Sequence, residues 1–534
     1  MPLGQGVVQM RRVLVALVLA GATVGWPATC AMAGGHVAAA PAAAAGSLQA
    51  DFNNDGFVDL AVGAVLEDVG SVGAAGAVNV LYGSAGGLTG AGSQLFSQDS
   101  PGVPGTAEGG DQFGAALAAG DFDNDGFADL AVGVVREDVG AAIGAGAVNV
   151  LYGSAAGLTG SGSQQFWQGA GGVAGTAETE DEFGYALTAG DFDNDSFADL
   201  AVGAHFETIG SAGGAGAVNV LSGSSGGLTG NGSQLFRQGA GGVLGTPEDN
   251  DQFGSSLAAG NFDNDGFVDL AIGAPLETVA SVELLGSVNV LSGSAGGLTG
   301  SGSQLLVEGF NGLPGNPENG DQFGWSLAAG DFNNNGFADL AVGVRGEDSD
   351  AGAVIALDGS AGGLSGSGGR VFRQGQGGVG GTSEEGDRFG HALAAGDFNN
   401  DNFADLAIGA PLEDIGAISD AGATNVLYGA AAGLTAAGNQ QFWQGAAGIG
   451  GRAESGDTFG WSLATGNFDN DNAADLAVGV PFEDIGAIDS AGAINVLYSI
   501  GGGLTAAGNQ QFWQGAAGVV GRAETFDTFG FALA

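Results

Sequence analysis

Short acidic segments recur along this chain, and each carries oxygen-bearing side chains at the same four positions. In segment 121–129, DFDNDGFAD, the first, third, fifth and ninth residues are Asp121, Asp123, Asp125 and Asp129. A calcium ion takes six to eight oxygen ligands, which a tight loop can supply from such side chains and one backbone carbonyl, here that of the seventh residue. Glycine at the sixth position permits the bend. The spacing therefore predicts a calcium loop.

Seven copies of this segment keep the spacing. The predicted ligands, with the seventh residue giving its carbonyl, are Asp51, Asn53, Asp55, Phe57, Asp59; Asp121, Asp123, Asp125, Phe127, Asp129; Asp191, Asp193, Asp195, Phe197, Asp199; Asn261, Asp263, Asp265, Phe267, Asp269; Asp331, Asn333, Asn335, Phe337, Asp339; Asp397, Asn399, Asp401, Phe403, Asp405; and Asn467, Asp469, Asp471, Ala473, Asp475. Asx turns held by their own side chains are the alternative. They account poorly for four oxygen side chains at fixed offsets in every copy.

The seven turns are not expected to bind calcium equally. The second and third carry four carboxylates each, whereas the fifth, with Asn333 and Asn335, carries two and should be the weakest. Ser196, Asn402 and Asn472 replace the bend glycine. Asn tolerates the left-handed conformation better than Ser, so Ser196 should cost the third site some affinity. We expect the ions, up to seven, to be structural.

The elements that position these turns belong to a long internal repeat. Phe-Gly opens a unit at Phe113, Phe183, Phe253, Phe323, Phe389, Phe459 and Phe529, every 70 residues except for one unit of 66. The short unit has lost residues around 347–350, which marks a loop there. Each unit holds four short apolar or alternating segments between turn residues, which is typical of a propeller blade. We therefore predict an all-β, seven-bladed propeller of four-stranded blades.

The two ends of the chain complement each other. The first acidic turn follows only a remnant, residues 47–50, whereas residues 529–534 form a Phe-Gly strand with no turn after it. We predict that this C-terminal strand completes the first blade and closes the ring, because an unpaired apolar strand would aggregate. A truncated eighth repeat is the alternative. The predicted organisation is a signal peptide at 1–33, an Ala/Gly/Pro-rich linker at 34–46 and the propeller at 47–534, with repeats starting near 47, 113, 183, 253, 323, 389 and 459.

Phe-Gly, an acidic turn and then Gly-Ala-Pro, as at 273–275 and 409–411, resemble the FG-GAP repeats of the integrin α-chain N-terminal propeller and its bacterial relatives. The resemblance covers about residues 47–534. It implies a seven-bladed propeller with calcium in the acidic turns, and a role in adhesion or ligand recognition through the face opposite those turns. Related repeats also accompany enzymes, so the resemblance leaves activity open.

The charge balance and the N-terminus limit the partners. The net charge is -49 with no lysine, which disfavours nucleic acid. Arg11 and Arg12, an apolar run at 13–24 and the small residues 31–33 indicate a secretory signal. No other apolar run could span a bilayer. We expect a secreted or cell-surface monomer that binds an extracellular protein or glycan.

The binding hypothesis places that partner on the loops after the second and fourth strands. Arg136, His205 and Arg345 stand at equivalent positions after the second strand and are candidate contacts. We expect Trp167, Trp443 and Trp513, which recur in the fourth strand, to pack between blades. We expect the repeated Glu-Asp pairs to be solvated or turn-forming.

No local motif nominates a catalytic set, so we expect no enzymatic activity. A carbohydrate-active or other hydrolytic or lyase enzyme built on a calcium-binding propeller is the alternative. An active site should break the repeat with a unique cluster on one face, and that difference separates the two hypotheses.

Overall fold

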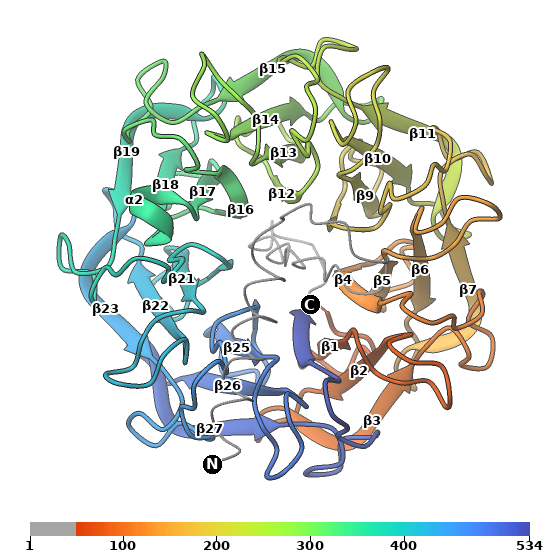
Figure 1. The fold of residues 1–534 in the computed structure, drawn as a ribbon, viewed down its shortest axis with the longest axis vertical. Helices are drawn as coiled ribbons and strands as arrows, with labels where there is room; N and C mark the ends of the chain where they lie inside the picture. The colour runs from red at the N-terminus through yellow and green to blue at the C-terminus, as the bar shows by residue number, and fades with distance from the viewer. Residues whose placement is uncertain (1–49) are drawn as a thin grey trace, which may run out of the picture.

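The computed structural model describes residues 50–534, so the predicted signal peptide and the predicted linker lie outside the described residues. Seven four-stranded antiparallel sheets stand around a central axis, like the blades of a propeller (Figure 1). This confirms the predicted fold class. Almost all of the regular structure is β, and the single helix among the described residues is the short α2 (Glu347–Asp350).

Each blade is ordered from the axis outward. The blades are β28 (Phe529–Leu533), β1 (Leu60–Ala64), β2 (Ala77–Tyr82) and β3 (Thr89–Phe96); β4 (Phe113–Gly120), β5 (Asp129–Val134), β6 (Ala147–Tyr152) and β7 (Thr159–Phe166); β8 (Leu187–Gly190), β9 (Asp199–Ala204), β10 (Ala217–Ser222) and β11 (Thr229–Phe236); β12 (Ser256–Gly260), β13 (Asp269–Ala274), β14 (Ser287–Ser292) and β15 (Thr299–Leu306); β16 (Phe323–Gly330), β17 (Asp339–Val344), β18 (Ala353–Asp358) and β19 (Ser365–Phe372); β20 (Leu393–Gly396), β21 (Asp405–Ala410), β22 (Ala423–Tyr428) and β23 (Thr435–Phe442); β24 (Leu463–Gly466), β25 (Asp475–Val480), β26 (Ala493–Ser499) and β27 (Leu504–Phe512).

The C-terminal strand closes the ring, as the sequence predicts. β28 pairs antiparallel with β1, with Leu533 opposite Val62. The Ala61 amide donates to the Ala534 carbonyl at 2.7 Å, and the Ala534 amide donates back at 3.1 Å. In Figure 1 the last, blue strand accordingly lies beside the first, red one. The first blade thus takes its inner strand from the far end of the chain, and no inner strand is left unpaired.

The glycines of the repeat allow neighbouring blades to approach closely. A side chain on Gly133, in the Gly-Ala-Pro position, would overlap the carbonyl of Gly184, the Phe-Gly glycine of the next unit. Gly184 itself has φ +98°. Phe183 beside it is fully buried, as is Phe122 at the second position of the acidic turn. The glycines of the repeat motif therefore let the backbones of neighbouring blades come into contact, and the phenylalanines fill the space around that contact.

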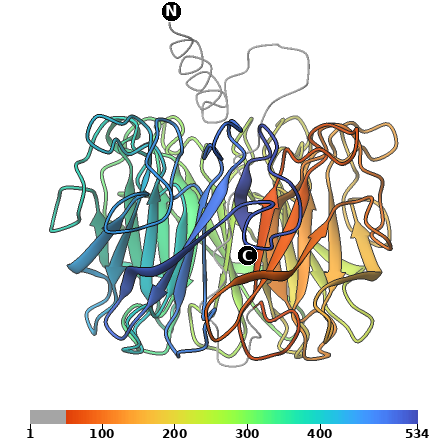
Figure 2. The same ribbon diagram turned by 90° about the horizontal axis from the view of Figure 1, so that it is seen from below.

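The antiparallel blades sort the connections onto two faces. The acidic turn, between the first and second strands of a blade, shares one face with the connection between the third and fourth strands. The longer connections that follow the second and fourth strands lie on the other face, and Figure 2 shows loops at both ends of the disc. The acidic turns and the predicted binding loops are therefore on opposite faces.

Candidate functional site

The ninth residue of each acidic turn anchors the turn to its blade. Asp129 is buried; one of its carboxylate oxygens accepts the Phe122 amide at 2.9 Å and the other accepts the Gly153 amide at 2.8 Å. The same pair of bonds is found at the other six turns. Burial raises the pKa of Asp129 to about 8, because the charged form loses its hydration. A nearby cation would favour the charged form.

Three carboxylates of the second turn converge. Asp121, Asp123 and Asp129 each offer an oxygen, and these oxygens lie within 4.8 Å of one another. Asp191, Asp193 and Asp199 do the same in the third turn. Two oxygens bound to one calcium ion at about 2.4 Å stand at most about 4.8 Å apart, so both clusters fit such an ion. These are the two turns with four carboxylates, and the acidic turns are suited to hold metal ions.

The fifth residue of these turns is used differently. Asp125 lies outside the cluster, and its Oδ1 accepts the Phe127 amide at 3.0 Å. The Asp125 amide in turn donates to Asp121 Oδ1 at 3.1 Å and to Asp123 Oδ1 at 3.2 Å. Asx-type hydrogen bonds are therefore present in the turn. They leave lone pairs on the carboxylates, so they are compatible with ion binding.

The turns differ in the contacts made by the side chain at the third position. Asp193 Oδ1, Asn333 Oδ1 and Asn399 Oδ1 are buried without a hydrogen-bond partner, as expected of oxygens that face a cation. In the fifth turn the Asn333 Nδ2 amide in addition donates to both oxygens of Asp339, at 3.2 and 3.0 Å. A donor there would compete with an ion for the same oxygens. The order of affinity among the turns stays a prediction. Ligation by the remaining predicted residues stays a prediction.

The backbone of every turn uses two left-handed residues. The sixth position has positive φ throughout, from +69° at Asn402 to +99° at Gly266, and Ser196 is held at +79°. The fourth position is also left-handed in all seven turns, for example +54° at Asn124. The sequence analysis missed this second feature, although an asparagine at each fourth position was a readable signal for it.

Neighbouring turns are joined by backbone hydrogen bonds. At six of the seven neighbouring pairs the amide of the eighth residue donates to the carbonyl of the first residue of the preceding turn, as from Ala128 to Asp51 at 3.1 Å and from Ala198 to Asp121 at 3.0 Å. Across the closure, Val58 donates to Asn467 at 3.3 Å. These bonds connect most turns to the turn of the next blade.

The predicted contact residues on the opposite face lie deeper than the sequence suggests. His205 and Arg345 are 3% exposed, whereas Arg136 keeps a partly exposed side chain. Glu182 receives both His205 Nε2 at 2.9 Å and Arg136 at 2.7 Å, and the Tyr185 ring stacks on His205 at 3.5 Å. These residues form a buried ion-pair and stacking cluster at the inner end of the blade.

The cluster continues along the inner strands. The Arg345 guanidinium lies 3.7 Å from the centroid of Trp325, which is a cation–π contact. His391 lies 4.8 Å from Trp461, and Trp461 lies 5.7 Å from Phe531. Four of these rings follow a Phe-Gly pair and so occupy one variable position of the repeat. The sequence analysis treated the units as nearly regular and missed this gathering, because several of its contacts join residues of different units.

One part of the cluster resembles a nucleophile arrangement. Ser255 Oγ lies 3.4 Å from His205 Nδ1, and His205 bonds to Glu182 through its other nitrogen. Ser255, however, is fully buried, and its hydroxyl donates to the Gln252 carbonyl at 2.8 Å. Burial also lowers the pKa of His205. The geometry has the three residue types of a hydrolase without an accessible nucleophile.

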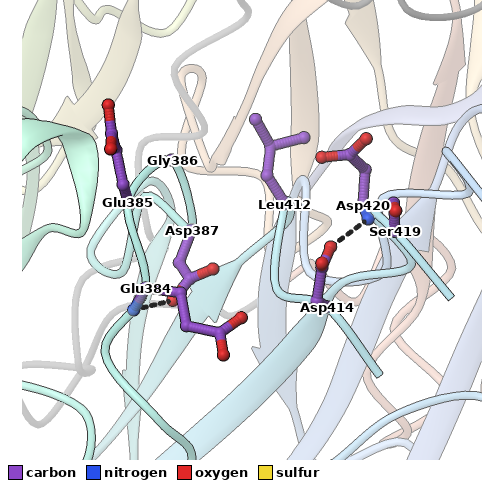
Figure 3. A pocket seen from close by; sticks show the side chains of 8 residues that line it. All are labelled: Glu384, Glu385, Gly386, Asp387, Leu412, Asp414, Ser419 and Asp420. Atoms are coloured by element: carbon purple, nitrogen blue, oxygen red, sulfur yellow. Dashed lines mark hydrogen bonds between the residues drawn. The ribbon is translucent and has the colours of Figure 1, made fainter. Parts of the chain in front are cut away.

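An acidic pocket opens on the same face, on the loops after the second and fourth strands (Figure 3). Its volume is about 210 Å³, and none of the eight residues that line it is basic. Glu384, Glu385 and Asp387 come from the connection that follows β19, and Asp414 and Asp420 from the connection that follows β21. The Asp420 amide donates to Asp414 at 2.9 Å, which holds the second loop in shape.

The expectation for the Glu-Asp pairs was half right. The Asp forms the turn, as Asp138 Oδ1 does by accepting the Gly144 amide at 2.8 Å. The Glu is half-buried or buried rather than fully solvated. Glu137 accepts Gln98 Nε2 at 2.6 Å from the preceding blade and Gln165 Nε2 at 3.2 Å from its own. The recurring tryptophans, of which Trp167 is one, are half-buried immediately after the outer strands.

The family model described as FG-GAP repeat matches residues 113–151, 183–221, 253–291, 323–357, 389–427 and 459–497. Integrin alpha-5 of Xenopus laevis is 31% identical over 242 residues, which is 44% of this chain and 20% of that protein. Integrin alpha-3 of Cricetulus griseus is 34% identical over 165 residues, 30% of this chain and 14% of that protein. Phosphatidylinositol-glycan-specific phospholipase D of Bos taurus is 30% identical over 169 residues, 30% of this chain and 19% of that protein. The chain thus matches a fifth or less of the length of these relatives.

Among solved structures, a rhamnogalacturonan lyase of Bacillus licheniformis matches with a TM-score of 0.35 at 13% identity, over 80% of this chain and 65% of that one. An exotype rhamnogalacturonan lyase matches with a TM-score of 0.36 at 12% identity, over 88% and 75%. Likeness at this level says nothing about activity. The repeat matches, the integrin relatives and the seven blades agree with one another, and they show that this chain is an integrin-like FG-GAP β-propeller.

Proposed function

We propose that this chain is a secreted, calcium-binding propeller that recognises an extracellular ligand without catalysis. Calcium would be held by the acidic turns, in which the first, third and ninth side chains converge. The anionic oxygens there would otherwise repel one another, so the ions would stabilise the blades. The integrin relatives and the predicted signal support a place outside the cell, and no helix among residues 50–534 is long and apolar enough to cross a membrane.

The observation that carries the binding proposal is the acidic pocket between the loops of the face opposite the acidic turns (Figure 3). Five carboxylates line it, and Glu384, Glu385 and Asp414 among them are exposed. Opposite charges across an interface speed association and exclude wrong partners. The partner we favour is therefore an extracellular protein that presents basic side chains. An acidic glycan would be repelled by this surface.

The test is a binding screen of residues 34–534, in calcium, against purified extracellular proteins and glycans. We expect a basic protein to bind, and the affinity to fall as salt is added, because exposed charges are screened. The double variant Glu385→Gln/Asp414→Asn should weaken binding several-fold. Glu180→Gln/Glu283→Gln, which removes two exposed charges of other units, is the matched control and should not. Equal affinity of the two double variants, or no protein ligand at all, would reject this binding face.

A glycan-active enzyme is the second candidate, and one observation favours it. Ser255, His205 and Glu182 break the repeat with a unique cluster at the inner strands, as an active site would. The screen therefore includes chromatographic analysis of each glycan after incubation. Cleavage that is lost in Ser255→Ala would replace the binding proposal with the enzymatic one.

A further inference from the structure

Six of the seven junctions between blades bring the same two side chains, a glutamine and a glutamate, together. A glutamine after the outer strand of one blade donates its side-chain amide to a glutamate of the next blade, as Gln374 does to Glu413 at 2.8 Å. The hydrogen bond is formed in Gln98–Glu137, Gln238–Glu277 and Gln374–Glu413. The same two side chains interact in Gln168–Glu207, Gln444–Glu483 and, across the ring closure, Gln514–Glu67. The glutamine supplies the donor that a buried carboxylate requires.

The same six junctions share a second polar residue. An asparagine of the third strand donates to a backbone carbonyl of the preceding blade, as Asn219 does to Ala174 at 2.8 Å. Its oxygen can also accept from the glutamine, as between Gln168 and Asn219 at 3.2 Å. These bonds fix how one blade sits on the next.

The junction between the β12–β15 blade and the β16–β19 blade departs from this plan at both positions. Glu308 stands where the glutamine should be, and Ile355 replaces the asparagine. Glu308 therefore meets Glu347 without the usual amide donor. Asp321 joins them, and one oxygen from each of these three carboxylates lies within 4.8 Å of the others.

These carboxylates are buried and only partly satisfied. Glu308 and Asp321 are 1% exposed and Glu347 is 3% exposed. Glu308 Oε1 accepts the Asn316 amide at 2.8 Å, but Oε2 of Glu308 and Oε2 of Glu347 have no hydrogen-bond partner. Glu67, Glu207 and Glu483 also keep one unpartnered Oε2, each beside a glutamine, whereas here the two unpartnered oxygens belong to two carboxylates of one cluster. Two such oxygens together point to a missing positive group.

One positive group is already present. Arg373 bonds to Glu347 Oε1 and lies 3.3 Å from Asp348, so its charge is shared by the Glu347 side of the cluster. The carboxylates of Glu308 and Asp321 form no ion pair with this arginine.

We propose that a calcium ion binds between Glu308, Asp321 and Glu347 and joins the two blades at this junction. The orphan oxygens, the oxygen spacing and the two uncompensated charges all fit a divalent cation that prefers oxygen ligands. The site is separate from the acidic turns, because Asp321 and Glu347 lie in connections of the opposite face. The ion replaces the hydrogen bond that the other junctions use.

The competing explanation is a proton. A protonated Glu308 could donate to Glu347 as the glutamine does elsewhere, and no metal would then be needed. The two explanations differ in the number of calcium ions that the protein binds. The glutamine found at the other junctions is also the substitution that removes the proposed site with least disturbance.

The experiment counts calcium bound to residues 34–534 by equilibrium dialysis in wild type, in Glu308→Gln and in the matched control Glu413→Gln at the next junction. We expect Glu308→Gln to bind one ion fewer than wild type, and Glu413→Gln to bind the wild-type number. Equal counts in wild type and Glu308→Gln would overturn the site. Because the result is a difference, it does not depend on how many acidic turns are filled.

Crystals of the wild-type protein soaked in Mn²⁺ give a second measurement that needs no variant. An anomalous peak between Glu308, Asp321 and Glu347 is expected. Absence of that peak while the acidic turns show peaks would overturn the proposal and favour the shared proton. Absence of peaks at the acidic turns with a peak here would instead reject calcium in the turns and keep this site.

Discussion

Ring closure by the last strand can be tested by truncating one buried leucine of that strand and comparing it with its counterpart in another blade. Leu533 in β28 and Leu463 in β24 occupy the same position of the repeat, four residues after the first residue of a Phe-Gly pair. Leu533 is 1% exposed opposite Val62, and Leu463 is fully buried opposite Val478. The first contact joins the two ends of the chain, whereas the second lies within one continuous unit. The pair therefore isolates the effect of closure.

We expect Leu533→Ala and Leu463→Ala to cost similar free energy of unfolding. Burying a leucine side chain is worth roughly 1.5–3 kcal/mol, and the cavity left by alanine brings the usual loss to about 2–5 kcal/mol. Since domains are stable by only about 5–15 kcal/mol, either change should lower the urea midpoint clearly. Tryptophan fluorescence is a suitable signal, because Trp461 lies 5.7 Å from Phe531 of the closing strand.

Ring closure would be refuted if the two substitutions changed the free energy of unfolding by clearly different amounts. If Leu463→Ala lowers stability by about 3 kcal/mol and Leu533→Ala changes it by less than about 0.5 kcal/mol, the closing strand is not held on β1 in solution. Hydrogen exchange gives a control on the same contact. The Ala61 amide, which donates to the Ala534 carbonyl, should exchange as slowly as the interior amides of the other blades.

Three further predictions concern the turns and the junctions. Ser196→Gly should raise the melting temperature, because serine is held at φ +79° and relief of a left-handed residue is worth about 1 kcal/mol; an unchanged or lower value in differential scanning calorimetry would contradict this. The calcium-free protein should lose stability as pH rises from about 4.5 to 7. Burial raises the pKa of Glu413 from 4.5 to about 7, so the folded state keeps a proton there that the unfolded state releases. Glu413→Gln should flatten part of that slope, measured as midpoint against pH. Asn219→Ala should cost about 1–3 kcal/mol, since it leaves the Ala174 carbonyl without its donor; urea unfolding would show it, with the exposed Asn231→Ala as the control.

The fold was predictable because the sequence repeats itself. Phe-Gly at Phe113 and its copies set the period, the acidic turns marked one face, and residues 529–534 supplied the strand that the first unit lacked. Each of these signals is local, or is a local signal copied many times. Pairing of β28 with β1 followed from counting alone, since every unit needs the same four strands.

The inner cluster was not predictable in the same way. Tyr185 and His205 are 20 residues apart and stack on each other, while Ser255, which reaches His205, belongs to the next unit. No local sequence pattern predicts contact between the residue after Phe-Gly and the residue after the second strand. That contact depends on the rotation between successive blades, which periodicity does not contain. The burial of His205 therefore came from the structure.

The short unit shows how regularity makes exceptions informative. Its loop has lost residues, Glu308 replaces glutamine at its junction, and Ile355 replaces asparagine. Any one of these alone would be an ordinary variation between copies. All of them meet at a single junction, where Glu347 begins the shortened connection α2. A carboxylate introduced alone would leave a costly buried charge, so its presence beside other changes indicates that the junction has adopted a different way of joining two blades.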